Sequence, residues 1–122
     1  MIVVTRYVVP VADAVGFKGL ARTALEAFAA RPGFVSGRVA RAIDDGGLWT
    51  LTTEWADVGS YRRALGSYDV KVHAVPLMYR SIDEASAYED LITAGGDGQL
   101  TEHRAARADD ADSAAPGRPD SR

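Results

Sequence analysis

The sequence predicts an α+β fold, the ferredoxin-like split β-α-β arrangement in which four antiparallel strands and two helices follow one another as βα-ββ-αβ. Three observations lead to this prediction: strand-length runs of β-branched and aromatic residues, two amphipathic segments with helical spacing, and turn residues between them. With 122 residues, 47 % of them hydrophobic and 25 % charged, the chain has the composition of one small globular domain.

The first strand and the first helix are predicted from the opening thirty or so residues. Residues 2–9, IVVTRYVV, are rich in β-branched side chains and end at Pro10, which is typical of a strand. Asp13 can cap a helix over 14–31, because apolar residues recur there on one face. Those residues are Phe17, Leu20, Ala21, Ala24, Leu25 and Phe28. The Pro-Gly pair at 32–33 ends the helix, since proline cannot continue its hydrogen-bond ladder.

A hairpin is expected next. Residues 34–43 form the second strand and 48–56 the third, and DDGG at 44–47 is a turn that joins antiparallel partners. Successive side chains of a strand point to opposite faces, so Trp49 and Trp55 lie on the same face of the sheet.

The second half of the pattern begins at Asp57, which can cap a helix over 58–67. Its apolar positions at helical spacing are Val58, Tyr61, Leu65 and Tyr68. Pro76 divides the following stretch, 69–84, into short helical turns. Residues 86–92 alternate weakly and are interpreted as the fourth strand.

The sequence divides at residue 93. Residues 93–122 contain no aromatic or β-branched apolar residue and a single leucine, so they offer little apolar surface to offset the entropy of ordering. We therefore expect one domain over 1–92 and a disordered C-terminal tail over 93–122. His103 lies in this tail and is a poor candidate for a site.

The predicted strands are apolar on both faces. In the first strand, Ile2, Val4 and Val8 lie on one face, and Val3, Tyr7 and Val9 lie on the other. Two helices can cover only one face of the sheet. We expect a second subunit to pack its own sheet against the other face, which makes the protein a homodimer.

Composition excludes several classes of function. There is no cysteine, and the two histidines form no metal-ligand motif such as HExxH, so we expect no metal site. No run approaches the roughly 18–20 apolar residues that cross a bilayer, and the start does not form a signal peptide. The net charge is −3 with scattered arginines, which argues against nucleic acid as a partner. A soluble cytoplasmic protein is expected.

The segments WTLTTEWADVGSYRRAL and YDVKVHAVPLMYRSIDEASAYEDL, placed in this pattern, resemble the antibiotic biosynthesis monooxygenase (ABM) domain family over residues 1–92. The most specific part is Trp55 at the end of the third strand, followed by Asp57 and by His73. Many members have a glutamate two positions before that tryptophan, where this chain has Thr53. The anthrone-oxidising members have an asparagine four positions before it, where this chain has Leu51.

The resemblance implies a dimeric α+β barrel with a pocket in each protomer between the sheet and its helices. Some members of the family oxidise polyketide anthrones to quinones with molecular oxygen and use neither metal nor flavin, and others degrade haem. In the anthrone-oxidising type, a tryptophan at this position and a tyrosine six positions later help hold the substrate, and Trp55 and Tyr61 match that pair.

The residues support a chemical interpretation beside a structural one. The Trp55 indole N–H could orient a substrate oxygen, or the ring could simply lock the helix to the sheet. A buried Tyr61 hydroxyl needs a partner, which a substrate could supply. His73 is the only histidine of the predicted domain, and imidazole is a common general base, so it could remove a proton or be merely structural. Trp55, Tyr61 and His73 are the candidate catalytic residues. The candidate substrate-binding residues are Tyr7, Leu51 and Tyr68.

The function predicted from the sequence is that of a cofactor-independent monooxygenase that oxidises a planar, anthrone-like aromatic substrate with molecular oxygen. Three alternatives stay open: a haem-binding or haem-degrading enzyme, a non-redox polyketide cyclase, and a non-catalytic dimer that binds a small ligand. The number and variety of polar groups do not distinguish them.

Overall fold

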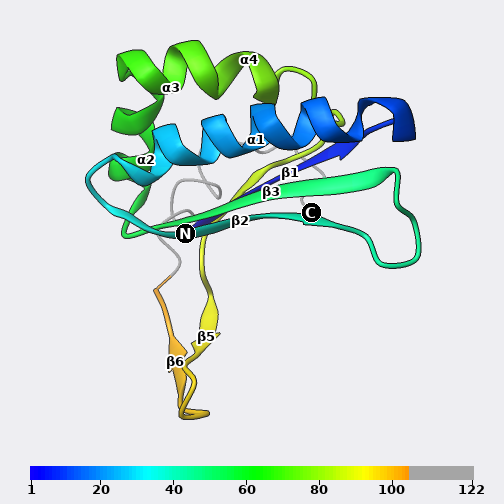
Figure 1. Ribbon diagram of the computed structural model, residues 1–122. Coiled ribbons are helices and arrows are strands. Elements are labelled where there is room, and N and C mark those ends of the chain that lie inside the picture. Colours follow the sequence, from blue (N-terminus) through cyan, green and yellow to red (C-terminus); the bar gives the residue numbers. More distant parts are fainter. Residues whose placement is uncertain (105–122) are drawn as a thin grey trace, which may run out of the picture. The chain divides into compact units, whose positions relative to one another are not determined.

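The computed structural model describes residues 1–104, which belong to two compact units divided between Tyr88 and Glu89. The first unit contains, in chain order, β1 (Ile2–Val8), the 3-10 turn η1 (Val11–Asp13), α1 (Ala14–Ala29), β2 (Phe34–Arg41), β3 (Leu48–Trp55), α2 (Val58–Leu65), α3 (Tyr68–His73), α4 (Val75–Met78) and β4 (Ala87–Tyr88). Its antiparallel sheet has the strand order β2-β3-β1-β4, and all helices lie on one face (Figure 1). The predicted α+β fold is confirmed.

The pairing of β1 with β3 decides which side chains face the helices. Val3 lies opposite Thr53, Thr5 opposite Leu51, and Tyr7 opposite Trp49. These odd-numbered residues are all buried, and so is Trp55 at the end of β3. Both tryptophans therefore share the helix-covered face, as the alternation predicts.

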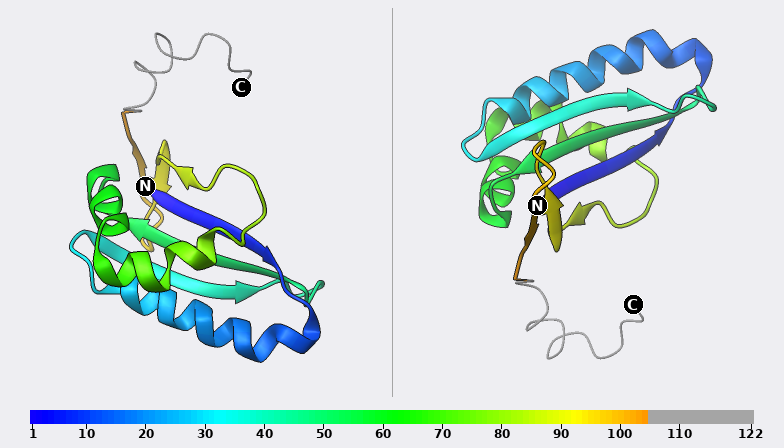
Figure 2. Two further views of the ribbon diagram at one scale, coloured as in Figure 1. Left: turned by 90° about the horizontal axis from the view of Figure 1, so that it is seen from above. Right: turned by 90° about the horizontal axis from the view of Figure 1, so that it is seen from below.

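The even-numbered residues of β1 and β3 form the other face, which no helix of residues 1–88 covers. Figure 2 shows this side from below, with the strands in front of the helices. Val4, Arg6, Thr50 and Thr52 are only partly buried there, and Val8 is 73 % exposed.

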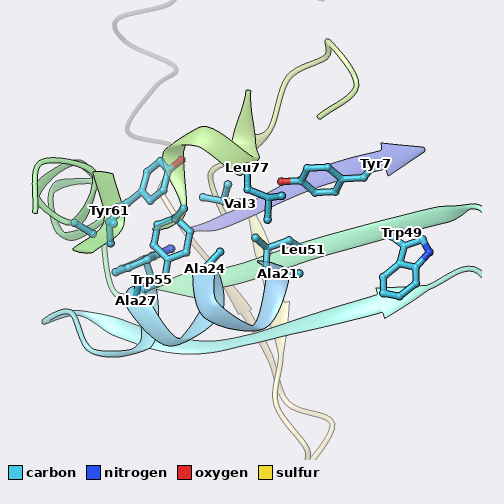
Figure 3. Close-up of a cluster of buried hydrophobic side chains, with 14 of the residues drawn as sticks. Val3, Tyr7, Ala21, Ala24, Ala27, Trp49, Leu51, Trp55, Tyr61 and Leu77 are labelled. Atoms are coloured by element: carbon cyan, nitrogen blue, oxygen red, sulfur yellow. The ribbon is translucent and has the colours of Figure 1, made fainter. Parts of the chain in front are cut away.

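The core lies between the sheet and the helices (Figure 3). The helix α1 buries Phe17, Ala21, Ala24, Ala27 and Phe28. Four of these belong to the predicted stripe, but Leu20, which the prediction included, is 50 % exposed, and Ala27 was not predicted. Gly37 of β2 lets the helix come close, because a Cβ atom there would lie 2.7 Å from Leu25 Cδ1.

Most elements end one or more residues earlier than expected, and two of these differences affect the site. The helix α2 ends at Leu65, where residues 58–67 were expected, and the chain turns at Gly66 before α3 begins. The strand β4 has two residues, which pair with Ile2 and Val3, where 86–92 was expected. The short helices α3 and α4 on either side of Pro76 agree with the expected helical turns.

The second unit contains a small antiparallel hairpin of β5 (Ile92–Ala94) and β6 (Leu100–Glu102). Gly98 has φ of 80° in its turn, and the Thr93 hydroxyl hydrogen-bonds His103 Nε2 at 2.8 Å. The expectation of a tail without structure from residue 93 differs from this hairpin, because a composition averaged over thirty residues hides a short strand pair joined by glycines. The rest of that stretch, 105–122, lies outside the described residues. Across residues 1–104, no helix is long and apolar enough to span a bilayer.

Candidate functional site

Trp55 stands at the centre of an aromatic cluster where β3 leads into α2. Its ring is 2 % exposed, and its centroid lies 5.4 Å from Phe34, 5.7 Å from Phe28 and 5.7 Å from Tyr61. The indole Nε1 donates a hydrogen bond to Thr53 Oγ1 at 2.8 Å. The N–H that the sequence analysis assigned to a substrate thus has a partner within the protein.

Tyr61 is positioned by the start of α2. The Asp57 carboxylate accepts a hydrogen bond from the Ser60 backbone N–H at 2.7 Å, which caps the helix and brings Tyr61 onto its inner face. The side chain is 7 % exposed, and its hydroxyl has no hydrogen-bond partner among residues 1–104. Burial raises the pKa of Tyr61, and the phenol of Tyr7 adds to this increase. Tyr61 therefore stays protonated at neutral pH.

Tyr7 is part of a chain of hydroxyls on β1. Its hydroxyl lies 2.8 Å from Thr5 Oγ1, and Thr5 Oγ1 donates to the Leu51 carbonyl oxygen at 3.3 Å. Because the single hydroxyl proton of Thr5 goes to Leu51, Tyr7 is the donor in its own bond to Thr5. Burial raises the pKa of Tyr7, although the Thr5 hydrogen bond and the positive charge of Arg80 act in the opposite direction.

The hydroxyls of Tyr7 and Tyr61 point toward one another across the space between sheet and helices (Figure 3). We call these two residues the phenol pair. One comes from β1 and the other from α2, so only the folded chain brings them together. The Tyr61 hydroxyl can donate a hydrogen bond to an oxygen atom that becomes negative in this space, whereas the one proton of Tyr7 is already donated to Thr5.

A cavity of about 460 Å³ lies between β1 and the segment that follows it from α2 onward, and we call it the interlayer cavity; neither Tyr7 nor Tyr61 is among the residues that line it. Thr5, which accepts from Tyr7, forms part of its wall. The other lining residues are Leu65, Lys71, Val75, Met78, Tyr79, Ser81 and Ser86. The walls are therefore mainly apolar, with three hydroxyl-bearing residues on the sheet side and one ammonium group. This composition is typical of a site for a small, largely apolar molecule.

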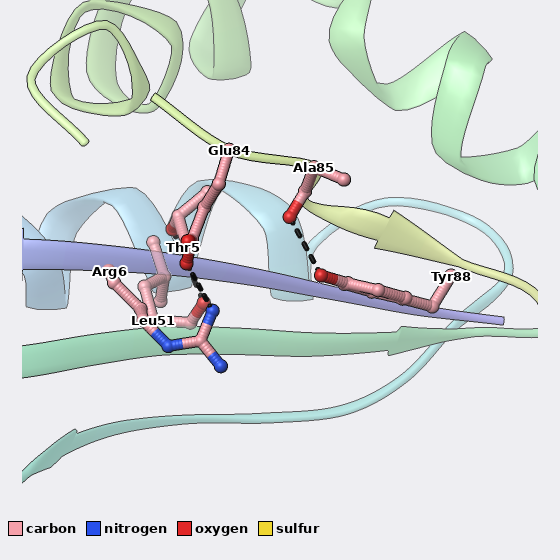
Figure 4. A network of polar contacts seen from close by, with 6 residues as sticks. All are labelled: Thr5, Arg6, Leu51, Glu84, Ala85 and Tyr88. Carbon is pink, nitrogen blue, oxygen red and sulfur yellow. Dashed lines mark hydrogen bonds and ion pairs between the residues drawn. The ribbon is translucent and has the colours of Figure 1, made fainter. Parts of the chain in front are cut away.

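The segment that carries Ser81 and Ser86 is held along β1. The Arg6 guanidinium forms an ion pair with Glu84 at 2.6 Å, and the Tyr88 hydroxyl donates to the Ala85 carbonyl oxygen at 2.8 Å (Figure 4). Arg6 belongs to the face of β1 opposite Thr5. The ion pair thus fixes one wall of the interlayer cavity from the outer side of the sheet.

The structure does not bring all the candidate residues together. Tyr68 is 78 % exposed, because the turn at Gly66 separates it from α2 and cancels the seven-residue spacing to Tyr61. His73 is exposed at the end of α3 and lines a different cavity of about 370 Å³, together with Arg80. The Leu51 side chain is buried in the core, and its carbonyl oxygen accepts the hydrogen bond from Thr5.

Sequence analysis missed Thr5, Lys71 and Ser81 as lining residues. Thr5 could have been found, because it is a polar residue on the same parity as Val3 and Tyr7 in the first strand. Lys71 and Ser81 carry no comparable signal, since their positions depend on how the short helices pack. Among residues 1–104 there is no group of three or more His, Cys, Asp or Glu side chains that could hold a metal ion.

Comparison with known proteins points to one family. The profile of the family described as antibiotic biosynthesis monooxygenase matches residues 1–74. The cofactor-independent oxygenase SnoaB from Streptomyces nogalater is 29 % identical, with 74 % of this chain and 94 % of that one covered and a TM-score of 0.58. A mutant of SnoaB is 33 % identical over 66 % of this chain and 82 % of that one, with a TM-score of 0.54.

A third solved structure shares the fold at lower identity. It is described as a putative antibiotic biosynthesis monooxygenase from Nitrosomonas europaea, and it is 14 % identical, with 74 % of this chain and 97 % of that one covered and a TM-score of 0.58. No curated protein sequence gives a significant match.

Proposed function

The chain belongs to the antibiotic biosynthesis monooxygenase family, and we propose that it is a cofactor-independent monooxygenase that oxidises a planar, anthrone-like aromatic substrate with molecular oxygen. The family and the resemblance to SnoaB, an oxygenase described as cofactor-independent, support the monooxygenase-type role. The substrate class and the site are the finer part of the proposal, and the buried, protonated Tyr61 hydroxyl is the observation that carries them.

An anthrone has a CH₂ group whose proton is acidic because the resulting carbanion is delocalised onto the ring oxygen as an enolate. Tyr61 stabilises this enolate, since burial keeps its hydroxyl protonated and able to donate a hydrogen bond to the enolate oxygen. Hydrogen bonds that strengthen as charge develops lower the barrier to proton loss. The apolar walls of the interlayer cavity exclude water and hold the flat ring system.

The electrons balance without a cofactor. The substrate CH₂ becomes a carbonyl that contains one oxygen atom of O₂, and the other oxygen atom leaves with the two hydrogens as water. The substrate loses four electrons and O₂ gains four, so no external reductant is needed. The enolate is the species that reduces oxygen.

Water is the proton acceptor in this proposal. His73, the sequence candidate for this role, lines another cavity together with Leu77 and Arg80. The interlayer cavity reaches the surface at exposed Lys71 and Tyr79, where water can receive the proton. The Lys71 ammonium also attracts an anionic oxygen of the substrate.

Oxygen consumption with 1,8-dihydroxyanthrone, measured in the presence of a chelator and without added flavin, tests the proposal. We expect uptake above the buffer rate and a fall of roughly ten- to a hundredfold in kcat/KM for Tyr61→Phe, because one hydrogen bond to the enolate is lost. Tyr68→Phe is the matched control: it removes the same atom from an exposed ring and should leave uptake unchanged.

Three outcomes would contradict the proposal. Oxygen uptake no faster than in buffer would show that the protein does not oxidise this substrate class. Haem titration would then test the haem-binding alternative. Conversion without oxygen uptake would indicate a cyclase. A loss in Tyr68→Phe as large as that in Tyr61→Phe would show that Tyr61 is not part of the site.

The homodimer expected from the sequence remains part of the proposal. The uncovered sheet face presents Val4 and Val8 beside threonines, which is suited to packing against a second copy. Sedimentation equilibrium of the full chain should give twice the 13.0 kDa mass of one chain. The Val4→Glu variant should give the mass of a monomer. Val11 lies in the 3-10 turn and is 87 % exposed, so the control variant Val11→Glu should remain a dimer. A single-chain mass for the unaltered protein would refute the dimer.

A further inference from the structure

A second cavity lies between α1 and β2, and no part of the proposed reaction uses it. It has a volume of about 600 Å³ and shares no lining residue with the interlayer cavity. We call it the α1–β2 groove. Its lining residues are Val15, Lys18, Gly19, Arg22, Leu25, Val39, Ala40, Arg41 and Trp49.

The floor of the groove is apolar and its rim is cationic. Val39, Leu25 and the edge of Trp49 form the floor, and three cations stand around them while no carboxylate lines the groove. Lys18 has no ion pair among residues 1–104. Arg22 forms an ion pair with Glu26 at 3.8 Å. Both side chains are well exposed to solvent, and an exposed ion pair of this kind stabilises a protein only weakly. A chain with a net charge of −3 thus concentrates positive charge at one apolar site.

Arg41 and Trp49 are already arranged for an anionic aromatic ligand. The Arg41 guanidinium carbon lies 5.5 Å from the centroid of the Trp49 ring, in a cation–π contact. The Trp49 ring is itself fixed by Phe17 and by a hydrogen bond from Nε1 to the Gly46 carbonyl oxygen at 3.2 Å. A stacked guanidinium keeps its N–H edge free for a carboxylate, which it can bind with two parallel hydrogen bonds.

Gly19 keeps the groove open on the helix side. A Cβ atom at Gly19 would meet nothing within 4 Å, so the backbone of α1 forms the wall there. A side chain at this position would project into the groove, whereas glycine leaves that space open.

We propose that the α1–β2 groove binds a flat aromatic carboxylate, with the ring on the apolar floor and the carboxylate between Lys18 and Arg41. The volume suits a fused two- or three-ring body. This site is separate from the phenol pair and does not depend on the oxygenase proposal.

Isothermal titration of the full chain with 2-naphthoate tests this site. We expect saturable binding of one molecule per chain, at least tenfold weaker binding of the neutral 2-naphthalenemethanol, and weaker binding of 2-naphthoate as salt rises. Lys18→Gln combined with Arg41→Gln should weaken 2-naphthoate binding at least tenfold.

The two glycines of α1 provide a matched pair that locates the ligand. Gly19→Leu fills the groove and should abolish binding. Gly16→Leu makes the same change in the same helix, also into open space, but Gly16 does not line the groove, so binding should persist. Both changes raise helix propensity. If circular dichroism shows that either leucine variant is unfolded, the double variant with Lys18→Gln and Arg41→Gln tests the site instead.

Several results would overturn the proposal. The absence of saturable 2-naphthoate binding to the unaltered protein is one of them, and unchanged binding in folded Gly19→Leu is another. Equal affinity for 2-naphthalenemethanol and 2-naphthoate would show that the cations of the groove do not contribute to binding. Binding that is lost in Ser81→Trp but kept in Gly19→Leu would place the probe in the interlayer cavity.

Discussion

Removal of the Thr5 hydroxyl tests how the site is built. Thr5 is 5 % exposed, accepts a hydrogen bond from Tyr7 at 2.8 Å and donates to the Leu51 carbonyl oxygen at 3.3 Å. Thr5→Val keeps the side-chain shape but leaves the Tyr7 phenol buried without a partner. An unsatisfied buried polar group costs about 1–3 kcal/mol, so the free energy of unfolding should fall by that amount.

A double-mutant cycle separates the hydrogen bond from packing. Tyr7→Phe removes the phenol while Thr5 keeps its bond to Leu51, so the free energy of unfolding should fall by about 0.5–1.5 kcal/mol. In the double variant neither partner is left unsatisfied. Its loss should therefore be about 1 kcal/mol smaller than the sum of the two single losses.

Urea unfolding at one fixed protein concentration, followed by tryptophan fluorescence, measures the three variants. The slope of free energy against urea should not change, because no variant alters the surface that unfolding exposes. Each lost kcal/mol should also lower Tm by about 4–8 °C for a domain of this size. Single losses that add to the double loss within about 0.3 kcal/mol would show that Thr5 and Tyr7 do not interact and would refute the hydroxyl chain.

Two further expectations concern stability. The pKa values of Tyr7 and Tyr61 are raised by burial, so their contribution to stability is complete below the ordinary tyrosine pKa near 10 and is lost as pH rises through the folded-state values. Urea midpoints should fall as pH rises above about 10, and the fall should be smaller in Tyr61→Phe; an equal fall in that variant would contradict the burial of Tyr61. Gly33→Ala should lower the urea midpoint strongly, because Gly33 has φ of 86° and a Cβ there would overlap the Ser60 side chain, whereas Gly46→Ala meets open space. Equal midpoints for these two variants would show that the turn after α1 tolerates a side chain.

Most of the fold could be predicted from the alternation and spacing of apolar side chains. The parity of β3 placed Trp49 and Trp55 on one face of the sheet, and the predicted stripe of α1 agreed with the buried residues except at Leu20 and Ala27. These patterns are local, because a strand repeats every two residues and a helix every 3.6. The end of α2 was predicted wrongly: the chain turns at Gly66, which places Tyr68 in solvent, although glycine is the residue type that most often ends a helix.

What could be known from the amino-acid order alone was the α+β fold, the helix-facing parity of the strands and the resemblance to one family, because each depends on short-range periodicity or on a contiguous motif. The meeting of the Tyr7 and Tyr61 hydroxyls, the separation of His73 from them and the cationic rim of the α1–β2 groove depended on tertiary packing. Each of these joins residues from elements far apart in the chain or depends on how a short helix rotates against the sheet. The free energies that set such contacts come from the whole core, which no single stretch of sequence contains.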